Sequence, residues 1–388
     1  MSLPSGLQAS VAARHERFLT ELEAMVNVDC GSYTPDGVNQ VADAVAASLA
    51  GLGATIERVA HQTEGAEPRL GDLVIGRLAG SGPRLLLIGH MDTVFEAGTA
   101  AARPFRRAGD RALGPGVSDM KAGLLAGLHA LGALQETGQR PSVTFVANPD
   151  EEIGSPFSTP HIRALAAEHD VTLVLECARA NGDIVSARKG IADYEVTLTG
   201  RAAHAGVEPE KGRSAILAAA EQIVALHALN GRWPGVTLNA GVVQGGTRPN
   251  VVAASCGYEL DLRAATTAEF DAAAAEVERV VAAPPIPGVT AALRRSAFHP
   301  PWERSAAGER LAALAIVIAG EIGFDLRAAS TGGASDGNTT AALGLPTLDG
   351  LGPIGGDDHS ADEWLDLSSI IPRVTLVAAL ILRVGESL

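Results

Sequence analysis

The sequence predicts an α/β protein in which a doubly wound, mostly parallel sheet forms the larger domain and a ferredoxin-like α+β domain is inserted into it. Two observations support this. Helical patterns alternate with short apolar strands over residues 10–176, which is typical of parallel sheets. Over residues 194–298 the order becomes strand, helix, strand, strand, helix, strand, as in a ferredoxin-like sandwich. We therefore expect domain segments at 1–188, 189–300 and 301–388.

The individual elements follow from apolar periodicity. In the larger domain, helices are predicted at residues 10–26, 38–51, 120–135, 161–168, 306–322, 336–343 and 368–384, and strands at 55–59, 73–78, 84–90, 142–147 and 172–175. In the inserted domain, strands are predicted at 194–199, 236–244, 251–263 and 290–298, and helices at 214–229 and 268–281. Ser118 or Asp119 is expected to cap the helix at 120–135, because short polar side chains accept hydrogen bonds from the first free N–H groups.

The bulk composition excludes several classes of protein. The 388 residues include 30 Lys and Arg against 45 Asp and Glu, a net charge of −15, which disfavours binding to nucleic acid or to anionic membranes. The three cysteines are far apart and form no CxxC pair, so neither a disulfide framework nor a thiolate zinc site is indicated. No signal peptide is evident, and the most apolar runs are shorter than the roughly 20 residues of a membrane span. A cytoplasmic location is expected.

The segment LLLIGHMDTV at 85–94 is the first candidate for a functional site. Its apolar run indicates a buried strand that ends at His90. In open α/β sheets, ligands bind at the carboxyl ends of the strands. His90 and Asp92 are two residues apart, so their side chains point to the same face.

Further polar side chains occupy similar positions along the chain. Five residues are placed where a two-metal site would need them: His90, Asp119, Glu152, Glu176 and His359. Imidazole and carboxylate ligands suit zinc, with cobalt or manganese as alternatives. A pair of ions needs a bridging group. A carboxylate can bridge two ions and an imidazole cannot, so Asp119 is the expected bridge.

The adjacent glutamates Glu151 and Glu152 point in different directions, so one can bind metal while the other acts as a general base. Asp92 is placed to hold the Nδ1–H of His90 and thereby fix its tautomer. Each feature has an ordinary alternative when taken alone, because acids at strand ends are commonly solvated and His359 could be a surface histidine. Their combination favours the metal site.

Three motifs then carry a resemblance to a known family. They are HMDTV at 90–94, GPGVSDMKAG at 114–123 and NPDEEIGS at 148–155. In order and spacing they are similar to the signatures of the zinc aminoacylase/carboxypeptidase family, which includes glutamate carboxypeptidase, acetylornithine deacetylase and succinyl-diaminopimelate desuccinylase. The resemblance covers nearly the whole chain and is strongest to the glutamate carboxypeptidase branch.

The resemblance implies a role for each residue. One zinc ion would be held by His90 and Glu176, and the second by Glu152 and His359, with Asp119 shared. Glu151 would be the general base and Asp92 would orient His90. The inserted domain would be a lid that also forms a homodimer. In its GRAAHAG motif at 200–206, His204 would reach the active site of the partner subunit and polarise the scissile carbonyl, although a simple loop histidine is the alternative. Asn250, in RPNVV at 248–252, would lie near the substrate.

Substrate recognition would fall to the lid and to a glycine-rich turn. Arg263, in DLR at 261–263, resembles the family arginine that grips the free α-carboxylate, a pairing that suits a planar guanidinium. Arg295 falls near a second arginine of the glutamate carboxypeptidases, although a structural strand arginine is an equal alternative. Gly333 offers backbone that a carboxylate can approach closely.

One position departs from the family. Glutamate-preferring carboxypeptidases carry a lysine shortly before the lid, and Asp183 stands there in this sequence. Arg188 and Lys189 are displaced toward the lid, where they could replace that lysine or form a solvated hinge. The sequence therefore leaves undecided whether a pocket for a glutamate side chain is present.

The resemblance thus implies a di-zinc carboxypeptidase that hydrolyses the amide bond before a C-terminal amino acid. The expected substrates are small peptides or N-acyl amino acids, with glutamate as the expected C-terminal residue in N-acyl-glutamate or folate-type compounds. An N-acyl amino acid deacylase of the acetylornithine deacetylase or aminoacylase type is the alternative within the hydrolases. A metal-binding scaffold without catalysis is the alternative outside them, and the presence of Glu151, Asp92 and His204 argues against it.

Overall fold

The structure is a computed structural model that describes residues 4–63 and 68–388. Its contacts divide the chain into two compact units. The first comprises Met1–Ala187, Arg304–Thr331 and Ser335–Leu388, and the second comprises Arg188–Glu303 with the short return Gly332–Ala334. The small unit is thus inserted into the larger one, and the turn at 332–334 joins it from a distant part of the chain.

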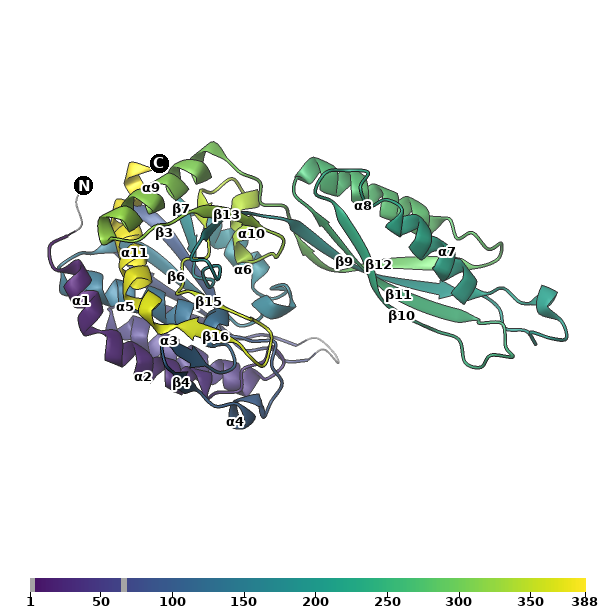
Figure 1. Cartoon of the computed structure of the whole chain (residues 1–388), viewed down its shortest axis with the longest axis horizontal. Helices are drawn as coiled ribbons and strands as arrows, with labels where there is room; N and C mark the ends of the chain where they lie inside the picture. Colours follow the sequence, from purple (N-terminus) through teal and green to yellow (C-terminus); the bar gives the residue numbers. More distant parts are fainter. Residues whose placement is uncertain (1–3, 64–67) are drawn as a thin grey trace. The chain divides into compact units, whose positions relative to one another are not determined.

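The first unit is built on a six-stranded sheet with the order β1-β2-β6-β3-β7-β14. Figure 1 labels its central strands β6, β3 and β7. The strands are β1 (Thr55–Val59), β2 (Leu73–Leu78), β6 (Pro141–Asn148), β3 (Ser81–His90), β7 (Val171–Val174) and β14 (Thr347–Leu348). β6, β3, β7 and β14 pair in parallel, whereas β1 and β2 form an antiparallel edge. The prediction of a mostly parallel sheet is confirmed.

Both faces of this sheet are covered, because successive side chains of β3 enter different cores. Leu85 and Leu87 pack into the main apolar cluster, whereas Leu86 and Ile88 pack into a smaller one on the opposite face. The main cluster involves α1 (Leu7–Ala13), α2 (His15–Val26), α3 (Pro35–Gly51), α5 (Ala122–Glu136), α9 (Ala306–Ile322) and α11 (Ile370–Arg383). The smaller cluster involves α6 (Thr159–Ala166), which packs on α10 (Asp336–Ala342). The sheet is therefore doubly wound, as predicted.

The segment Leu367–Glu386, which contains α11, has the length and mean hydropathy (1.8) of a membrane span. However, 72% of its apolar window is buried, and α11 packs against α5 and α9. Core helices of water-soluble domains have the same composition. The packing identifies α11 as such a core helix.

Two small sheets and a short helix were not predicted, because elements of two to five residues show little periodicity. β15 (Gly355–Gly356), β16 (Trp364–Asp366), β5 (Arg111–Leu113) and β4 (Arg106–Ala108) form one sheet in that order. β8 (Ile184–Arg188) pairs with β13 (Ala328–Thr331), and α4 (Thr99–Ala102) is a single helical turn. The loop between β15 and β16 carries His359, one of the predicted metal ligands.

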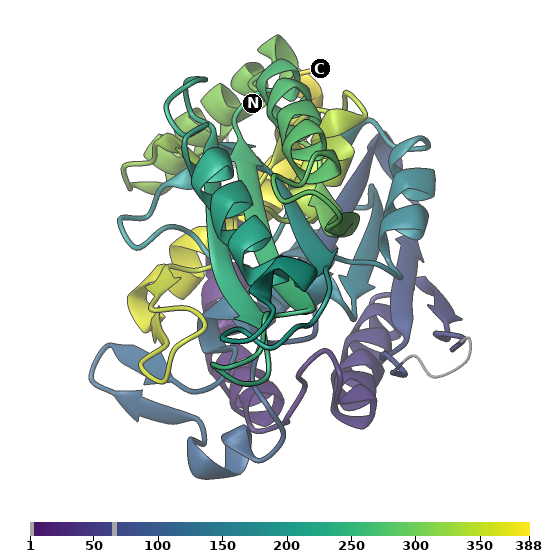
Figure 2. The ribbon, with the colours of Figure 1, turned by 90° about the vertical axis from the view of Figure 1, so that its right-hand side faces the viewer.

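The second unit is a four-stranded antiparallel sheet with the order β10-β11-β9-β12. Its elements, in chain order, are β9 (Gly190–Thr199), α7 (Ala215–His227), β10 (Thr237–Gly245), β11 (Ser255–Ala264), α8 (Thr267–Ala282) and β12 (Thr290–His299). Both helices lie on one face of the sheet and share a single apolar core with it (Figure 2). This is the ferredoxin-like arrangement that the sequence predicts.

Candidate metal centre

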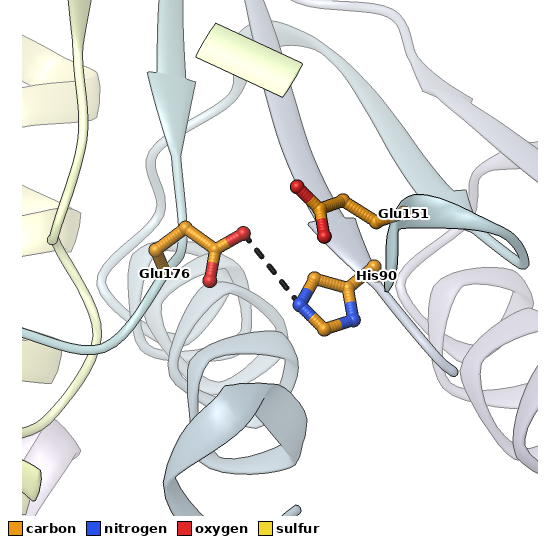
Figure 3. A group of neighbouring side chains, drawn as sticks. All are labelled: His90, Glu151 and Glu176. Carbon is orange, nitrogen blue, oxygen red and sulfur yellow. Dashed lines mark ion pairs between the residues drawn. The ribbon is translucent and has the colours of Figure 1, made fainter. Parts of the chain in front are cut away.

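His90 ends β3 at the carboxyl edge of the parallel sheet, and its side chain is almost fully buried. Its Nε2 lies 3.0 Å from Oδ1 of Asp119 and 3.6 Å from Oε1 of Glu176. Glu176 follows β7, the parallel neighbour of β3, so both side chains arrive at the same edge (Figure 3). The predicted convergence of strand ends is realised here.

Asp119 connects two imidazoles. Its Oδ1 faces Nε2 of His90, and its Oδ2 lies 3.1 Å from Nε2 of His359. Burial alone would raise the pKa of Asp119, but hydrogen bonds from His359 and His90 outweigh it and lower the pKa below the usual range. One carboxylate with a different histidine at each oxygen is the arrangement that a bridging metal ligand requires.

The expectation that Ser118 or Asp119 caps a helix beginning at 120 is wrong. α5 begins at Ala122, Lys121 occupies the N-cap position, and no side chain caps it. Asp119 has non-helical backbone angles (φ −107°, ψ 97°) within the preceding turn, Val117–Lys121. Its carboxylate is engaged by the histidines and is therefore not available to the helix.

The two glutamates after β6 lie in a short turn, Glu151–Ile153, and take different positions. Oε2 of Glu152 is 3.2 Å from Nε2 of His359. Glu151 instead joins His90 and Glu176 in a group whose ligand atoms lie within 4.8 Å of one another (Figure 3). Burial raises the pKa of Glu151 well above its usual range, which is the direction that a general base requires.

Asp92 contributes to the site differently from the sequence expectation. Nδ1 of His90 lies 3.0 Å from the backbone carbonyl of Asp92 and 3.5 Å from its Oδ1, so the closer partner is the carbonyl. The carboxylate accepts hydrogen bonds from the backbone N–H groups of Glu151 and Glu152, each at 3.1 Å, and from the Ser32 hydroxyl at 2.7 Å. Asp92 therefore orients His90 mainly through its backbone and holds the glutamate turn with its side chain.

The cluster as a whole favours positive charge. Burial alone would lower the pKa of His90, but Glu176, Asp119 and Asp92 raise it well above its usual value. Burial, with a smaller contribution from the negative charges of Asp119 and Asp349, raises the pKa of Glu176 to about 7. Carboxylate and imidazole donors that are gathered in this way, and partly shielded from water, suit a divalent cation.

His204 and Asn250 lie side by side in the second unit. The backbone carbonyl of Asn250 accepts the N–H of Ala205 at 3.0 Å, and His204 pairs with Val251. Nδ1 of His204 accepts the N–H of Gly206 at 3.2 Å, which leaves Nε2 as the protonated ring nitrogen. The exposed Nε2–H can therefore donate to a carbonyl oxygen.

Arg263 and the glycine-rich turn also meet within the second unit. Nε and NH2 of Arg263 both contact the Asp261 carboxylate, and NH1 donates to the carbonyl of Gly332 at 2.9 Å. N–H donors remain on both terminal nitrogens, which is the end that grips a carboxylate. The carbonyl of Gly333 accepts NH1 of Arg188 at 3.1 Å. Gly333 is thus next to the candidate carboxylate site.

Arg295 does not join Arg263. It pairs with Tyr194, whose side chain faces the helices, whereas Arg263 pairs with Ile191 on the alternate face. Its guanidinium stacks on the ring of Phe298, 4.4 Å from the centroid. This favours the structural alternative for Arg295.

Sequence reasoning missed several residues that hold the site. Buried Asp150 accepts the N–H of Phe157 at 2.6 Å, and buried Asp336 accepts the side chains of Asn148 and Ser155, each at 2.6 Å. Glu363 accepts three backbone N–H groups around Asp119. Asp150 stands within the recognised motif, whereas Asp336 and Glu363 carry no local signal because their partners are far away in the sequence.

Comparison with known proteins agrees with this geometry. The model of peptidase family M20/M25/M40 matches residues 86–383, a range that contains every candidate metal ligand. Carboxypeptidase G2 of Pseudomonas sp. (strain RS-16) is 32% identical over 370 residues, covering 94% of this chain and 88% of that protein. N-acetyl-L-citrulline deacetylase of Xanthomonas campestris is 30% identical over 226 residues, covering 53% and 60%.

Solved structures share the fold. Aminopeptidase PepT from Bacillus cereus superposes with a TM-score of 0.76 at 23% identity, covering 95% of this chain and 98% of that one. The M20 family metallo-carboxypeptidase Sso-CP2 from Sulfolobus solfataricus gives 0.74 at 16% identity, covering 94% and 98%. The family recognised from the three motifs is confirmed: the chain belongs to peptidase family M20/M25/M40 and is a metal-dependent hydrolase.

Proposed function

We propose that this hydrolase is a di-zinc carboxypeptidase that cleaves the amide bond before a C-terminal amino acid. The observation that carries the proposal is the pair of contacts made by Asp119, which presents one oxygen to His90 and the other to His359. His90 and Glu176 would hold one ion, Glu152 and His359 the other, and Asp119 both. Cobalt and manganese fit the same donors.

Each catalytic role rests on a contact of the chain itself. Two such ions supply Lewis acidity and lower the pKa of a water molecule toward neutrality. Glu151 takes the proton from the attacking water and returns it to the leaving amine, a task that suits its burial and raised pKa. The Nε2–H of His204 donates to the carbonyl oxygen as negative charge develops there. The free donors of Arg263 bind the substrate α-carboxylate and so select exopeptidase chemistry.

A homodimer would complete each site. His204 and Arg263 lie near opposite ends of the β9–β11 ladder, so one small substrate cannot touch both in one chain. The surface of the second unit supplies an interface: β10 is an exposed edge strand, and α7 exposes Ile216, Leu217 and Val224. In this proposal a second copy covers this surface, and its His204 serves the first copy's site.

Glutamate is the preferred C-terminal residue in this proposal, as in N-acyl-glutamate or folate-type substrates. The support is the 32% identity to carboxypeptidase G2 over most of both chains. Asp183, which stands where a lysine would bind the glutamate side chain, favours the alternative of an N-acyl amino acid deacylase with another specificity. Its carboxylate accepts a hydrogen bond from the Asn181 amide and offers no positive charge.

A cytoplasmic location is also part of this proposal. The three cysteines are free thiols, as is usual for proteins of a reducing compartment.

The test is a substrate panel for the zinc-loaded enzyme. It compares N-acyl amides with C-terminal Glu, Asp, Gly and Arg, and acetyl with aromatic acyl groups. The proposal expects the highest kcat/KM for C-terminal Glu. A preference for acetyl amides of other amino acids would favour the deacylase. If no amide is hydrolysed at full metal occupancy, the protein would instead be a metal-binding scaffold without catalytic activity.

A further inference from the structure

Glu363 is a buried carboxylate that none of the steps above uses. It is 1% exposed, and its Oε1 accepts the backbone N–H groups of Ser118 at 2.8 Å and Asp119 at 3.0 Å. Its Oε2 accepts the N–H of Gly116 at 2.9 Å. One side chain thus binds three N–H groups of the segment that presents the bridging carboxylate.

These three N–H groups have a particular need for an acceptor. The turn Val117–Lys121 has non-helical angles at Asp119 and Met120, so it does not close a regular helical ladder. Buried backbone N–H groups are nearly always paired. The two oxygens of Glu363 accept all three N–H groups at once, so this side chain can fix the backbone of Asp119 in its non-helical conformation.

Glu363 also belongs to the loop that carries His359. The loop runs from β15 to β16, and its base is closed by a 3.0 Å bond from Nε1 of Trp364 to Asp357. The side chain of His359 is 54% exposed, so packing does little to hold it. Its loop is tied back by Arg103, which donates to the carbonyl of Ser360 at 3.0 Å, and by Glu363.

We propose that Glu363 is a positioning residue that fixes Asp119 relative to His359, so that the metal centre is formed before a cation arrives. The inference rests on the proposed metal centre but not on the proposed substrate. Asp119 and His359 are 240 positions apart in the chain, and Glu363 lies four residues after His359. It therefore joins the two ligand-bearing segments directly. Groups that orient metal ligands in this way commonly change metal affinity 10- to 100-fold when they are removed.

The first test is Glu363→Gln in the full-length protein, titrated with Co²⁺ after chelation and dialysis. The amide keeps the shape of the side chain but turns a hydrogen-bond donor toward backbone N–H groups. We expect the affinity for the second equivalent of cobalt to fall about 10- to 100-fold, with an altered visible absorption spectrum. Asp366→Asn is the matched control, because Asp366 lies three residues further along, at the end of β16, and its side chain accepts hydrogen bonds from Ser368 alone among the described residues. It should titrate like the wild type.

The outcomes separate this inference from the function proposed above. If Glu363→Gln binds two equivalents with wild-type affinity and spectrum, the positioning role is wrong even if the enzyme hydrolyses amides. If the wild type binds no cobalt, the metal centre and this inference both fail. If Glu363→Gln binds cobalt more weakly, as expected, but the wild-type enzyme cleaves no amide, the positioning role stands and the catalytic proposal fails.

A second measurement needs no variant and covers the case in which Glu363→Gln does not fold. Amide hydrogen exchange of the chelated wild type reports directly on Gly116, Ser118 and Asp119. We expect these amides to exchange slowly without metal, because Glu363 already binds them. Fast exchange that becomes slow only after cobalt is added would show that the cation orders the turn, and would overturn the inference.

Discussion

Arg263 and His204 lie toward opposite ends of one antiparallel ladder. Arg263 pairs with Ile191 at one end, and Ser255 pairs with Thr199, five residues before His204, at the other. These two pairs are eight residues apart, which corresponds to about 26 Å at 3.3 Å per residue. Two groups that are proposed to contact one small substrate are therefore too far apart within a single chain.

This separation predicts complementation between two inactive variants. Arg263→Ala and His204→Ala should each lose most activity alone. In a mixed dimer, one site would carry both defects and the other neither, so random mixing should restore about a quarter of wild-type activity. The measurement is turnover after co-expression, with each variant alone as the control. A mixture as inactive as its parents would mean that one chain supplies both residues to a site, either to its own site or to that of its partner.

Glu151→Gln should abolish turnover while leaving the metals in place. The amide cannot accept the proton of the attacking water, so kcat should fall by about 10²- to 10⁴-fold. Glu152→Gln is the comparison, since Glu152 contacts His359 and should lose metal as well as activity. Metal analysis of dialysed protein, together with kcat, distinguishes the two. A Glu151→Gln enzyme with near wild-type kcat would refute the assignment of the base.

Arg263 and Arg295 form a matched pair for testing carboxylate recognition. Arg263→Lys keeps the charge but removes the planar fork, so kcat/KM should fall by roughly 10- to 100-fold for substrates with a free C-terminal carboxylate. C-terminally amidated substrates should be poor for the wild type and should discriminate little between the two enzymes. Arg295→Ala should leave kcat/KM within about twofold, because Arg295 stacks on Phe298 on the helix-facing side. Equal losses for both arginines would contradict this division.

Divalent cations should stabilise the folded protein substantially. Asp119, Glu152 and Glu176 are gathered around two histidines, and a bound cation removes their mutual repulsion. Zinc at 1,000 times its Kd would contribute about 4 kcal/mol. Thermal unfolding with zinc and with a chelator measures the effect. Zinc should raise the unfolding temperature of Glu152→Gln less than that of the wild type. An equal increase in both proteins would mean that the ions bind elsewhere.

His299 should make the second unit sensitive to acid. Burial, followed by the charge of Arg188, lowers its pKa to about 4, below the unfolded value near 6.5. The unfolded chain therefore takes up the proton first, and stability is lost as the pH falls from 6.5 toward 4. At pH 5 the loss is about 2 kcal/mol. The urea midpoints at pH 7.5 and pH 5 should differ less in His299→Gln than in the wild type, and equal differences in the two proteins would rule out this role.

Much of the fold and the composition of the site could be predicted from the sequence. Apolar periodicity is a local property, and it placed the central strand, the inserted α+β unit and most helices within a few residues of their observed bounds. Three candidate ligands, His90, Glu152 and Glu176, were predicted from a topological rule, because parallel strands deliver their carboxyl ends to one edge. Asp119 and His359 lie in loops, and their predicted roles as ligands came from the family resemblance.

What only the tertiary structure decided concerns the partners of polar groups. The backbone carbonyl of Asp92 lies closer to His90 than its carboxylate does, and the helix cap predicted at Asp119 is replaced by contacts with two histidines. The face on which Arg295 lies depends on strand register, and Glu363 binds an N–H group 244 positions away. Periodicity records which side of an element is buried, whereas pairing of buried polar groups depends on segments that meet only after folding.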